Sequence, residues 1–303
     1  MSKKYVMPYG LNTPPIKAAL KWKLDGLLQK KRPPVPDDDF MLTVRTLSSE
    51  ALQEEKDFIV WLGHATFLTQ LNGIRILTDP VFGDVPLTPR LADFPIDPAL
   101  LNPDIILISH GHYDHLDLKS LEQLGIHEKQ IPLILPSNLS SYLKPKANTI
   151  ELGWYEKHQH KEVTITALPA SHWHRRGAFD FNRALWCSFL IECKGQSIFF
   201  AGDTTMDDHF SEIAARIPSI DIALMPIGAY LPRSIMRQSH MDPEEALHAT
   251  EILTATQMIP YHYGTFKLSD EPIGEPHSWI TKLAEESEID ISVLEVGEMK
   301  TIL

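Results

Sequence analysis

The feature that most constrains this chain is a dense polar cluster placed directly after an apolar segment. Residues 104–108 read Asp-Ile-Ile-Leu-Ile, and an H-x-H-x-D-H pattern follows at His110, His112, Asp114 and His115. Such an apolar run predicts a buried strand. Buried imidazoles and carboxylates need polar partners, so a cluster at the end of a strand is costly unless it binds something. The spacing can direct the two halves of the cluster toward two adjacent metal ions.

Other predicted strands are followed by residues of the same kind. His172, Asp203 and His262 each come shortly after an apolar run. The full set then contains five imidazoles, two carboxylates and no thiolate, which suits Zn²⁺, with Mn²⁺ or iron as alternatives. Seven ligands are too many for one tetrahedral ion. We therefore predict a site for two ions rather than the simpler alternative, a solvated polar loop.

The seven candidate ligands divide into two sets that share one carboxylate. The first set consists of His110, His112, His172 and Asp203. The second set consists of Asp114, His115, His262 and Asp203. A hydroxide bridging the two ions would complete both coordination shells.

Apolar runs and turn signals predict an α/β fold in which strand hairpins followed by helices occur twice. Asn72-Gly73 and Lys194-Gly195 are the expected hairpin turns. Strands are expected at residues 58–62, 66–71, 74–78, 104–109, 131–135, 163–168, 185–192, 197–201, 220–225, 258–260 and 291–295. Helices are expected at residues 116–124, 137–143, 208–216, 243–255 (after the N-cap Asp242) and 277–286. This order suggests two packed sheets with helices outside.

Composition limits the classes of partner and the cellular location. The net charge of the 303 residues is −12, which argues against binding nucleic acid. No apolar run is long enough to span a membrane, and no apolar signal-peptide core follows the first residues. Cys187 and Cys193 lie in one apolar segment and are expected to be core thiols. We expect a cytoplasmic protein, with peripheral contact to the inner membrane surface as a further option.

A basic segment precedes the main domain. Residues 1–40 are rich in proline and are expected to be an appendage, followed by a catalytic domain over residues 41–303. Residues 16–31 place apolar side chains on one helical stripe among lysines. A basic amphipathic helix of this kind can lie on an anionic membrane. It can equally pack on the domain by the same stripe, and both alternatives stay open.

The pattern H-x-H-x-D-H with later His, Asp and His resembles the metallo-β-lactamase superfamily over about residues 55–300. This resemblance implies an αββα sandwich. Shorter motifs resemble the group of phospholipases D that hydrolyse N-acyl-phosphatidylethanolamine. They are W-L-G-H-A-T-F from Trp61, L-T-D-P-V-F from Leu77, P-I-G-A-Y-L-P-R from Pro226, H-M-D-P-E-E-A from His240 and H-Y-G-T-F from His262. The chain carries Tyr263 where the mammalian enzyme of that group commonly has Trp.

The resemblance implies a two-metal phosphodiesterase that cleaves N-acyl-phosphatidylethanolamine-like phospholipids. A metal-bridging hydroxide would attack phosphorus and release phosphatidic acid. The alternative is a soluble metal-dependent hydrolase on the same fold, such as a lactonase or a small phosphodiesterase. The acidic charge disfavours a ribonuclease, and the complete ligand set disfavours a non-catalytic binding protein. The sequence leaves the oligomeric state open.

Two of the predicted ligands and several further residues are candidates for catalytic or supporting roles. Asp114, Asp203 and His240 are the candidate catalytic residues, with His240 as an acid or as a neighbour of the ligands. The alternative for His240 is a surface position. Candidates for contact with a ligand or substrate are His64, Asp79, Tyr230 and Arg233. Asp79 is expected to orient a ligand imidazole, whereas a buried structural role is the alternative for His64, and a structural role equally for Tyr230 and Arg233.

Overall fold

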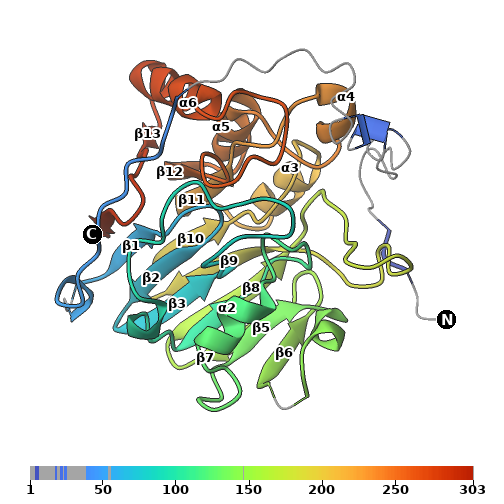
Figure 1. The fold of residues 1–303 in the computed structure, drawn as a ribbon. Coiled ribbons are helices and arrows are strands. Elements are labelled where there is room, and N and C mark those ends of the chain that lie inside the picture. The colour runs from blue at the N-terminus through green and yellow to red at the C-terminus, as the bar shows by residue number, and fades with distance from the viewer. Residues whose placement is uncertain are drawn as a thin grey trace.

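The chain folds into two facing β-sheets with helices on both outer sides, as the sequence predicts (Figure 1). The computed structural model describes residues 4–6, 18, 21–22, 24–25, 39–53, 56–145 and 147–302. The first sheet has the strand order β14-β1-β2-β3-β4-β5-β6, and the second has the order β13-β12-β11-β10-β9-β8-β7.

The strands of the first sheet come from the first half of the chain and its last residues. They are β1 (Phe58–Trp61), β2 (Phe67–Leu71), β3 (Ile74–Thr78), β4 (Ile105–Leu107), β5 (Leu133–Pro136), β6 (Thr149–Leu152) and β14 (Met299–Thr301). The strands of the second sheet are β7 (Lys157–His160), β8 (Val163–Leu168), β9 (Ser188–Cys193), β10 (Gln196–Phe200), β11 (Ile220–Pro226), β12 (Ala255–Tyr261) and β13 (Asp290–Ile291).

Both faces of the first sheet are buried. In β1, Ile59 and Trp61 join the core between the sheets, and Phe58 and Val60 join the apolar cluster on the outer face. Alternate side chains of a strand point to opposite faces, so a strand covered on both sides is apolar throughout. The helix α2 (Leu118–Gln123) contributes Leu121 to that outer cluster. This explains why the central strands are continuous apolar runs.

Helices also cover the outer face of the second sheet. The helix α5 (Pro243–Ile252) contacts both β11 and β12, and α3 (His209–Ala214) and α6 (Glu275–Glu286) contact α5 (Figure 1). The short helix α4 (Arg233–Met236) precedes α5 in the chain. The predicted N-cap of α5 is confirmed. The Asp242 side chain accepts a hydrogen bond from the Glu245 amide at 2.9 Å, and the Glu245 side chain accepts one from the Asp242 amide. This capping box fixes where α5 begins.

The two predicted hairpins are confirmed. Asn72 and Gly73 turn β2 into β3, and Lys194 and Gly195 turn β9 into β10. All four residues have positive φ, as a two-residue hairpin turn that follows the twist of its strands requires. Each hairpin sets the direction of its second strand, so that β3 and β10 both end at the edge where polar residues gather.

Some predicted elements were wrong at the periphery. The helix expected at 137–143 is instead the short 3₁₀ segment η3 (Leu139–Tyr142). Two further 3₁₀ segments are η1 (Ala51–Gln53) and η2 (Pro98–Leu100). The strand expected at 291–295 is β13, reduced to two residues. The edge strands β6, β7 and β14 have no clear apolar pattern, and β7 reads Lys-His-Gln-His. These strands are defined by their hydrogen bonds to neighbouring strands rather than by a local apolar pattern.

Most of the N-terminal appendage lies outside the described residues. Within the helix predicted over 16–31, the described residues Ala18, Lys21, Trp22, Leu24 and Asp25 are helical. Trp22 Nε1 donates a hydrogen bond to Asp270 Oδ2 at 2.6 Å, which links this segment to the domain. The other residues of the predicted helix lie outside the described residues. In the part of the chain that is described, no helix is both long and apolar enough to cross a bilayer.

The first residue of α3 predicts a measurable pH dependence of stability. His209 is fully buried, and burial lowers its pKa to about 3. Below about pH 6.5, the His209 imidazole binds a proton in the unfolded chain but not in the native chain. The free energy of unfolding therefore falls as the pH drops from about 6.5 toward 3. This group contributes a loss of about 1.4 kcal/mol per pH unit. In urea unfolding at several pH values, His209→Gln should show a shallower loss than the wild type. Parallel curves would contradict this origin.

Candidate metal centre

The polar residues meet at the carboxyl ends of strands from both sheets. β3, β4, β8, β10 and β12 end just before Asp79, His110, His172, Asp203 and His262, respectively. Because β10, β11 and β12 run parallel, their ends lie along one edge of the second sheet. Loops at such an edge are the usual place for a site in α/β folds. The fold thus brings together residues as far apart in the sequence as Asp79 and His262.

The structure brings all seven predicted ligand residues into two adjoining groups. In the first group, His112 Nδ1 lies 2.9 Å from His110 Nε2 and 3.1 Å from His172 Nε2. Asp203 Oδ2 lies 3.9 Å from each of these two Nε2 atoms. Three imidazole nitrogens and a carboxylate oxygen therefore converge on one small volume, all within 4.8 Å of one another.

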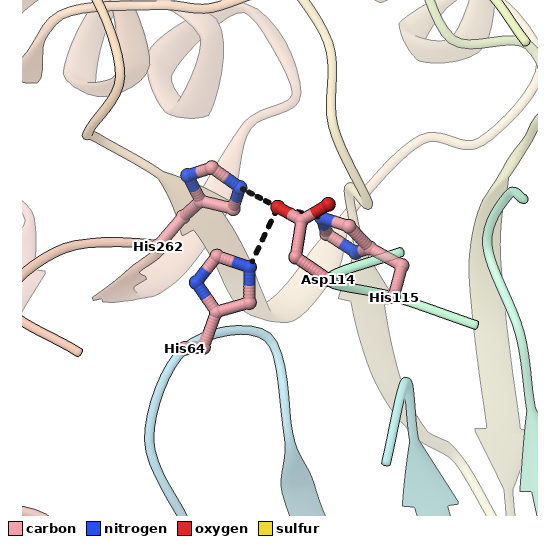
Figure 2. A group of neighbouring side chains, drawn as sticks. All are labelled: His64, Asp114, His115 and His262. Atoms are coloured by element: carbon pink, nitrogen blue, oxygen red, sulfur yellow. Dashed lines mark hydrogen bonds and ion pairs between the residues drawn. The ribbon is translucent and has the colours of Figure 1, made fainter. Parts of the chain in front are cut away.

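The second group contains His64, which the predicted set lacked. It consists of His64, Asp114, His115 and His262, whose ligand atoms also lie within 4.8 Å of one another. Figure 2 shows the three imidazoles around the Asp114 carboxylate. Asp114 Oδ2 lies 3.2 Å from His64 Nε2, 3.6 Å from His115 Nε2 and 3.8 Å from His262 Nε2.

Asp203 lies between the two groups. Its Oδ2 faces the first group, whereas its Oδ1 lies 3.2 Å from His115 Nε2 and 3.0 Å from His262 Nε2 of the second. One carboxylate thus offers one oxygen to each group. This is the arrangement in which a single side chain can bridge two cations.

The donor atoms fit a pair of cations. Among the described residues, His115 Nε2, Asp203 Oδ1 and His262 Nε2 are buried and have no hydrogen-bond partner that satisfies normal geometry. Buried polar atoms without partners are costly, and their common focus indicates a missing ligand. Imidazole nitrogens with carboxylate oxygens suit Zn²⁺ and related transition metals. The residues present therefore fit the metal ions that the sequence predicts.

The charges of the site point the same way. Burial lowers the pKa of both His112 and His172 to about 3, so these rings are neutral and have free lone pairs. Burial opposes the ionisation of His115 and Asp203, but their mutual attraction prevails. It raises the pKa of His115 and lowers the pKa of Asp203 well below its usual range.

Asp79 lies behind the ligands and holds one of them. Its Oδ2 accepts hydrogen bonds from His115 Nδ1 at 2.7 Å and from Ser109 Oγ at 2.5 Å, and its Oδ1 accepts one from the Ser109 amide at 2.7 Å. A carboxylate on the far nitrogen fixes the orientation of an imidazole ligand. Ser109 was not predicted, although its position directly before His110 was a usable signal.

His64 is fixed by its backbone as well as its ring. Its φ of 52° lies in the left-handed region, which is uncommon outside glycine. The His64 amide donates to Thr265 Oγ1 at 2.8 Å, and its carbonyl accepts from Trp61 Nε1 at 2.9 Å. These bonds hold the imidazole against His262, at a ring distance of 4.2 Å. The His64 side chain is therefore a buried member of the second group.

The remaining candidate residues are placed differently from one another. His240 Nδ1 lies 3.8 Å from Asp203 Oδ2, at the rim of the metal groups. Tyr230 is buried, and its hydroxyl donates to Glu275 Oε1 at 2.5 Å. Arg233 forms an ion pair with Glu245 at the start of α5. Neither Tyr230 nor Arg233 belongs to the ligand groups.

An aromatic side chain beside the site was missed by the sequence analysis. The Trp173 ring lies 4.5 Å from the His112 ring and 6.1 Å from the Phe181 ring. Trp173 follows His172 directly, so its proximity to the ligands could have been inferred. Together with the Ser239 carbonyl, which lies 3.1 Å from His172 Nδ1, it lines the side of the first group.

Comparison with known proteins identifies the family of this chain. Residues 74–263 match the model of a family described as the beta-lactamase superfamily domain. A mitochondrial N-acyl-phosphatidylethanolamine-hydrolysing phospholipase D from Saccharomyces cerevisiae is 41% identical over 241 residues, which cover 74% of this chain and 51% of that protein. The chain thus spans about half the length of the yeast relative.

A second relative and a solved structure extend the match. N-acyl-phosphatidylethanolamine-hydrolysing phospholipase D 1 from Caenorhabditis elegans is 31% identical over 277 residues, covering 82% of this chain and 76% of that protein. The structure of Igni18, a metallo hydrolase from Ignicoccus hospitalis, superposes with a TM-score of 0.62 at 21% identity. It covers 82% of this chain and 99% of that one, and it supports the fold. The chain belongs to the metallo-β-lactamase superfamily.

Proposed function

We propose that this chain is a zinc-dependent phosphodiesterase of phospholipase D type that cleaves N-acyl-phosphatidylethanolamine-like phospholipids. The observation that carries the proposal is Asp203, which presents one carboxylate oxygen to each of two ligand groups. Relatives named for hydrolysis of this phospholipid support the choice of substrate. The products would be phosphatidic acid and an N-acylethanolamine.

The two groups have distinct tasks in this proposal. His110, His112 and His172, together with Asp203, would hold one ion, and the second group, which also uses Asp203, would hold the other. Two bound divalent ions supply an activated water near neutral pH and stabilise negative charge on the phosphoryl oxygens. The chain itself fixes the ligands, with Asp79 holding the His115 ring from behind. No side-chain nucleophile is required.

His240 is proposed to contact the phosphoryl group or its leaving oxygen. Its Nδ1 is buried and has no hydrogen-bond partner among the described residues, and it lies toward Asp203. Burial lowers the pKa of His240 to about 3, so at neutral pH the ring is uncharged and can donate one N–H. It therefore stabilises charge through a hydrogen bond rather than by delivering a proton from an imidazolium ion.

His240→Ala should lower kcat for phospholipid hydrolysis by about 100-fold, the usual effect of losing one positioned hydrogen-bonding side chain. The metal content after dialysis should stay at the wild-type value, because the first and second groups remain intact. Steady-state kinetics and metal analysis of the same samples measure both. A variant that loses metal, or one with unchanged kcat, would contradict this role.

The substrate proposal is tested with zinc-loaded protein and a panel of phospholipids that includes N-acyl-phosphatidylethanolamine. Mass spectrometry of the products should show phosphatidic acid and N-acylethanolamine, and their release should stop on chelation and resume when Zn²⁺ is restored. Cleavage of small lactones or water-soluble phosphodiesters by protein that leaves every phospholipid intact would favour the alternative hydrolase.

A further inference from the structure

A loop beside the metal centre carries an exposed aromatic side chain together with basic side chains. Residues 174–182 follow the ligand His172 and form a closed loop. The His174 amide donates to Asn182 Oδ1 at 3.0 Å, and the Asn182 amide donates to the His174 carbonyl at 2.8 Å. These two bonds make a neck, so the residues between them project together.

The tip of the loop is braced from within. Asp180 accepts hydrogen bonds from the Gly177 amide at 2.7 Å and from the Tyr142 hydroxyl at 2.7 Å. Arg176 Nη1 donates to the Gly111 carbonyl at 3.0 Å, which ties the loop to the metal-binding segment. The guanidinium of Arg176 also lies 4.2 Å from the centre of the Tyr113 ring. The loop therefore holds its shape without a partner.

Apolar side chains on this surface are directed to solvent. Phe179 at the tip is 86% exposed, and Tyr113 is 45% exposed; among the described residues, no other aromatic side chain is classed as exposed. Residues 4–6 lie beside the neck, since the Tyr5 amide donates to the Asn182 carbonyl at 2.9 Å (Figure 1). Val6, which follows, is 70% exposed. The loop thus carries the exposed Phe179, binds the Tyr113 hydroxyl through the Arg176 carbonyl, and is paired at its neck with the segment that bears Val6.

Positive charge accompanies these apolar side chains. Residues 173–183 contain Arg175, Arg176 and Arg183 against the single acid Asp180, a charge of +2 in a chain whose net charge is −12. Lys4 adds a further cation, with its Nζ 5.8 Å from the centre of the Phe181 ring. Aromatic side chains together with basic ones favour the headgroup region of anionic membranes.

We propose that the 174–182 loop, with Val6 and Tyr113, docks on the headgroup region of an anionic phospholipid bilayer. The loop starts two residues after the ligand His172, so docking would place the bilayer surface next to the metal groups. A phospholipid could then reach the site without leaving the water-lipid interface entirely. The biological purpose of this docking rests on the proposed phospholipid substrate, whereas the binding itself can be measured separately.

Sedimentation with vesicles that contain no ethanolamine lipid tests the docking without any turnover. The wild type should bind vesicles of phosphatidylcholine mixed with phosphatidylglycerol more tightly than phosphatidylcholine alone. Phe179→Ser should weaken partitioning to the mixed vesicles roughly tenfold or more, the effect expected for one large apolar side chain. A double variant, Arg175→Gln with Arg183→Gln, should remove most of the preference for the anionic lipid.

Leu100→Ser is the matched control. Leu100 is 41% exposed in η2, which precedes β4, whereas the metal-binding segment follows β4. This control should bind vesicles as the wild type does, and Phe179→Ser should still hydrolyse substrate dispersed in detergent. Unchanged vesicle binding by Phe179→Ser overturns the proposal, as does an equal loss in the control. A change confined to self-association in size-exclusion chromatography would assign the surface to a second copy instead, and would also overturn it.

A failure of docking and a failure of the substrate proposal give different results. If the loop variants lose vesicle binding while no phospholipid is ever cleaved, the docking surface stands and the substrate proposal fails. If phospholipid is cleaved but Phe179→Ser binds vesicles normally, the substrate proposal stands and the docking surface fails.

Discussion

Asp203→Ala should abolish the activity and reduce the metal content from two ions per chain to at most one. Asp203 offers Oδ2 to the first group and Oδ1 to the second, so its loss removes an oxygen ligand from both. It also leaves His115 and His262 without the carboxylate that they face. We expect kcat to fall on the order of 10³-fold or more. Metal analysis after dialysis and product formation are measured on the same protein.

Asp208→Ala is the matched control for this variant. Asp208 precedes α3 five residues further along, is exposed, and makes no side-chain capping bond. It removes the same formal charge from the same region, so it should retain both ions and full activity. Two tightly bound ions in Asp203→Ala would show that this residue does not bridge the groups.

Gly228→Ala should disrupt the second group without changing any ligand. A Cβ at Gly228 would lie 2.1 Å from the His262 carbonyl oxygen and 3.4 Å from Tyr263 Cα, so the backbone of the ligand must move. Overpacking of this kind usually costs about 1–3 kcal/mol of stability. We expect weaker binding of one ion together with a lower free energy of unfolding, measured by calorimetric metal titration and by urea unfolding.

Gly83→Ala provides the comparison. A Cβ at Gly83 has no other atom within 4 Å, and its backbone is not in the left-handed region. Its stability and metal binding should stay near the wild-type values. Normal metal affinity in Gly228→Ala would show that the position of His262 is less constrained than the close approach of the two backbones indicates.

The sequence predicted the centre of the fold better than its edges. The strand β4 is buried on both faces, so a continuous apolar run predicts it. The hairpin turns at Asn72-Gly73 and Lys194-Gly195 require positive φ, which asparagine and glycine adopt more readily than most residue types. The polar strand β7 carries no such signal, because it exists through its pairing with β8. Local patterns therefore reveal buried strands, whereas edge strands are defined by their hydrogen bonds to a neighbouring strand, as β14 is by β1 at the other end of the chain.

The same distinction applies to the site. The predicted ligands could be identified because their residue types and spacing are unusual after apolar strands. The neighbourhood of His64 could not, since its contact with Asp114 joins residues 50 positions apart. Tyr230 illustrates the opposite case: its motif suggested a substrate contact, yet its hydroxyl bonds to Glu275 on α6. Sequence shows which side chains can do chemistry, and packing decides where they point.

Hydrolysis in water enriched in ¹⁸O tests the central claim most directly. Zinc-loaded protein is incubated with N-acyl-phosphatidylethanolamine, and both products are analysed by mass spectrometry. Attack of water on phosphorus predicts one ¹⁸O in phosphatidic acid and none in N-acylethanolamine, with no products from Asp203→Ala. Label in the alcohol, label in a released fatty acid, or no zinc-dependent products would contradict a phospholipase D acting through this His and Asp cluster.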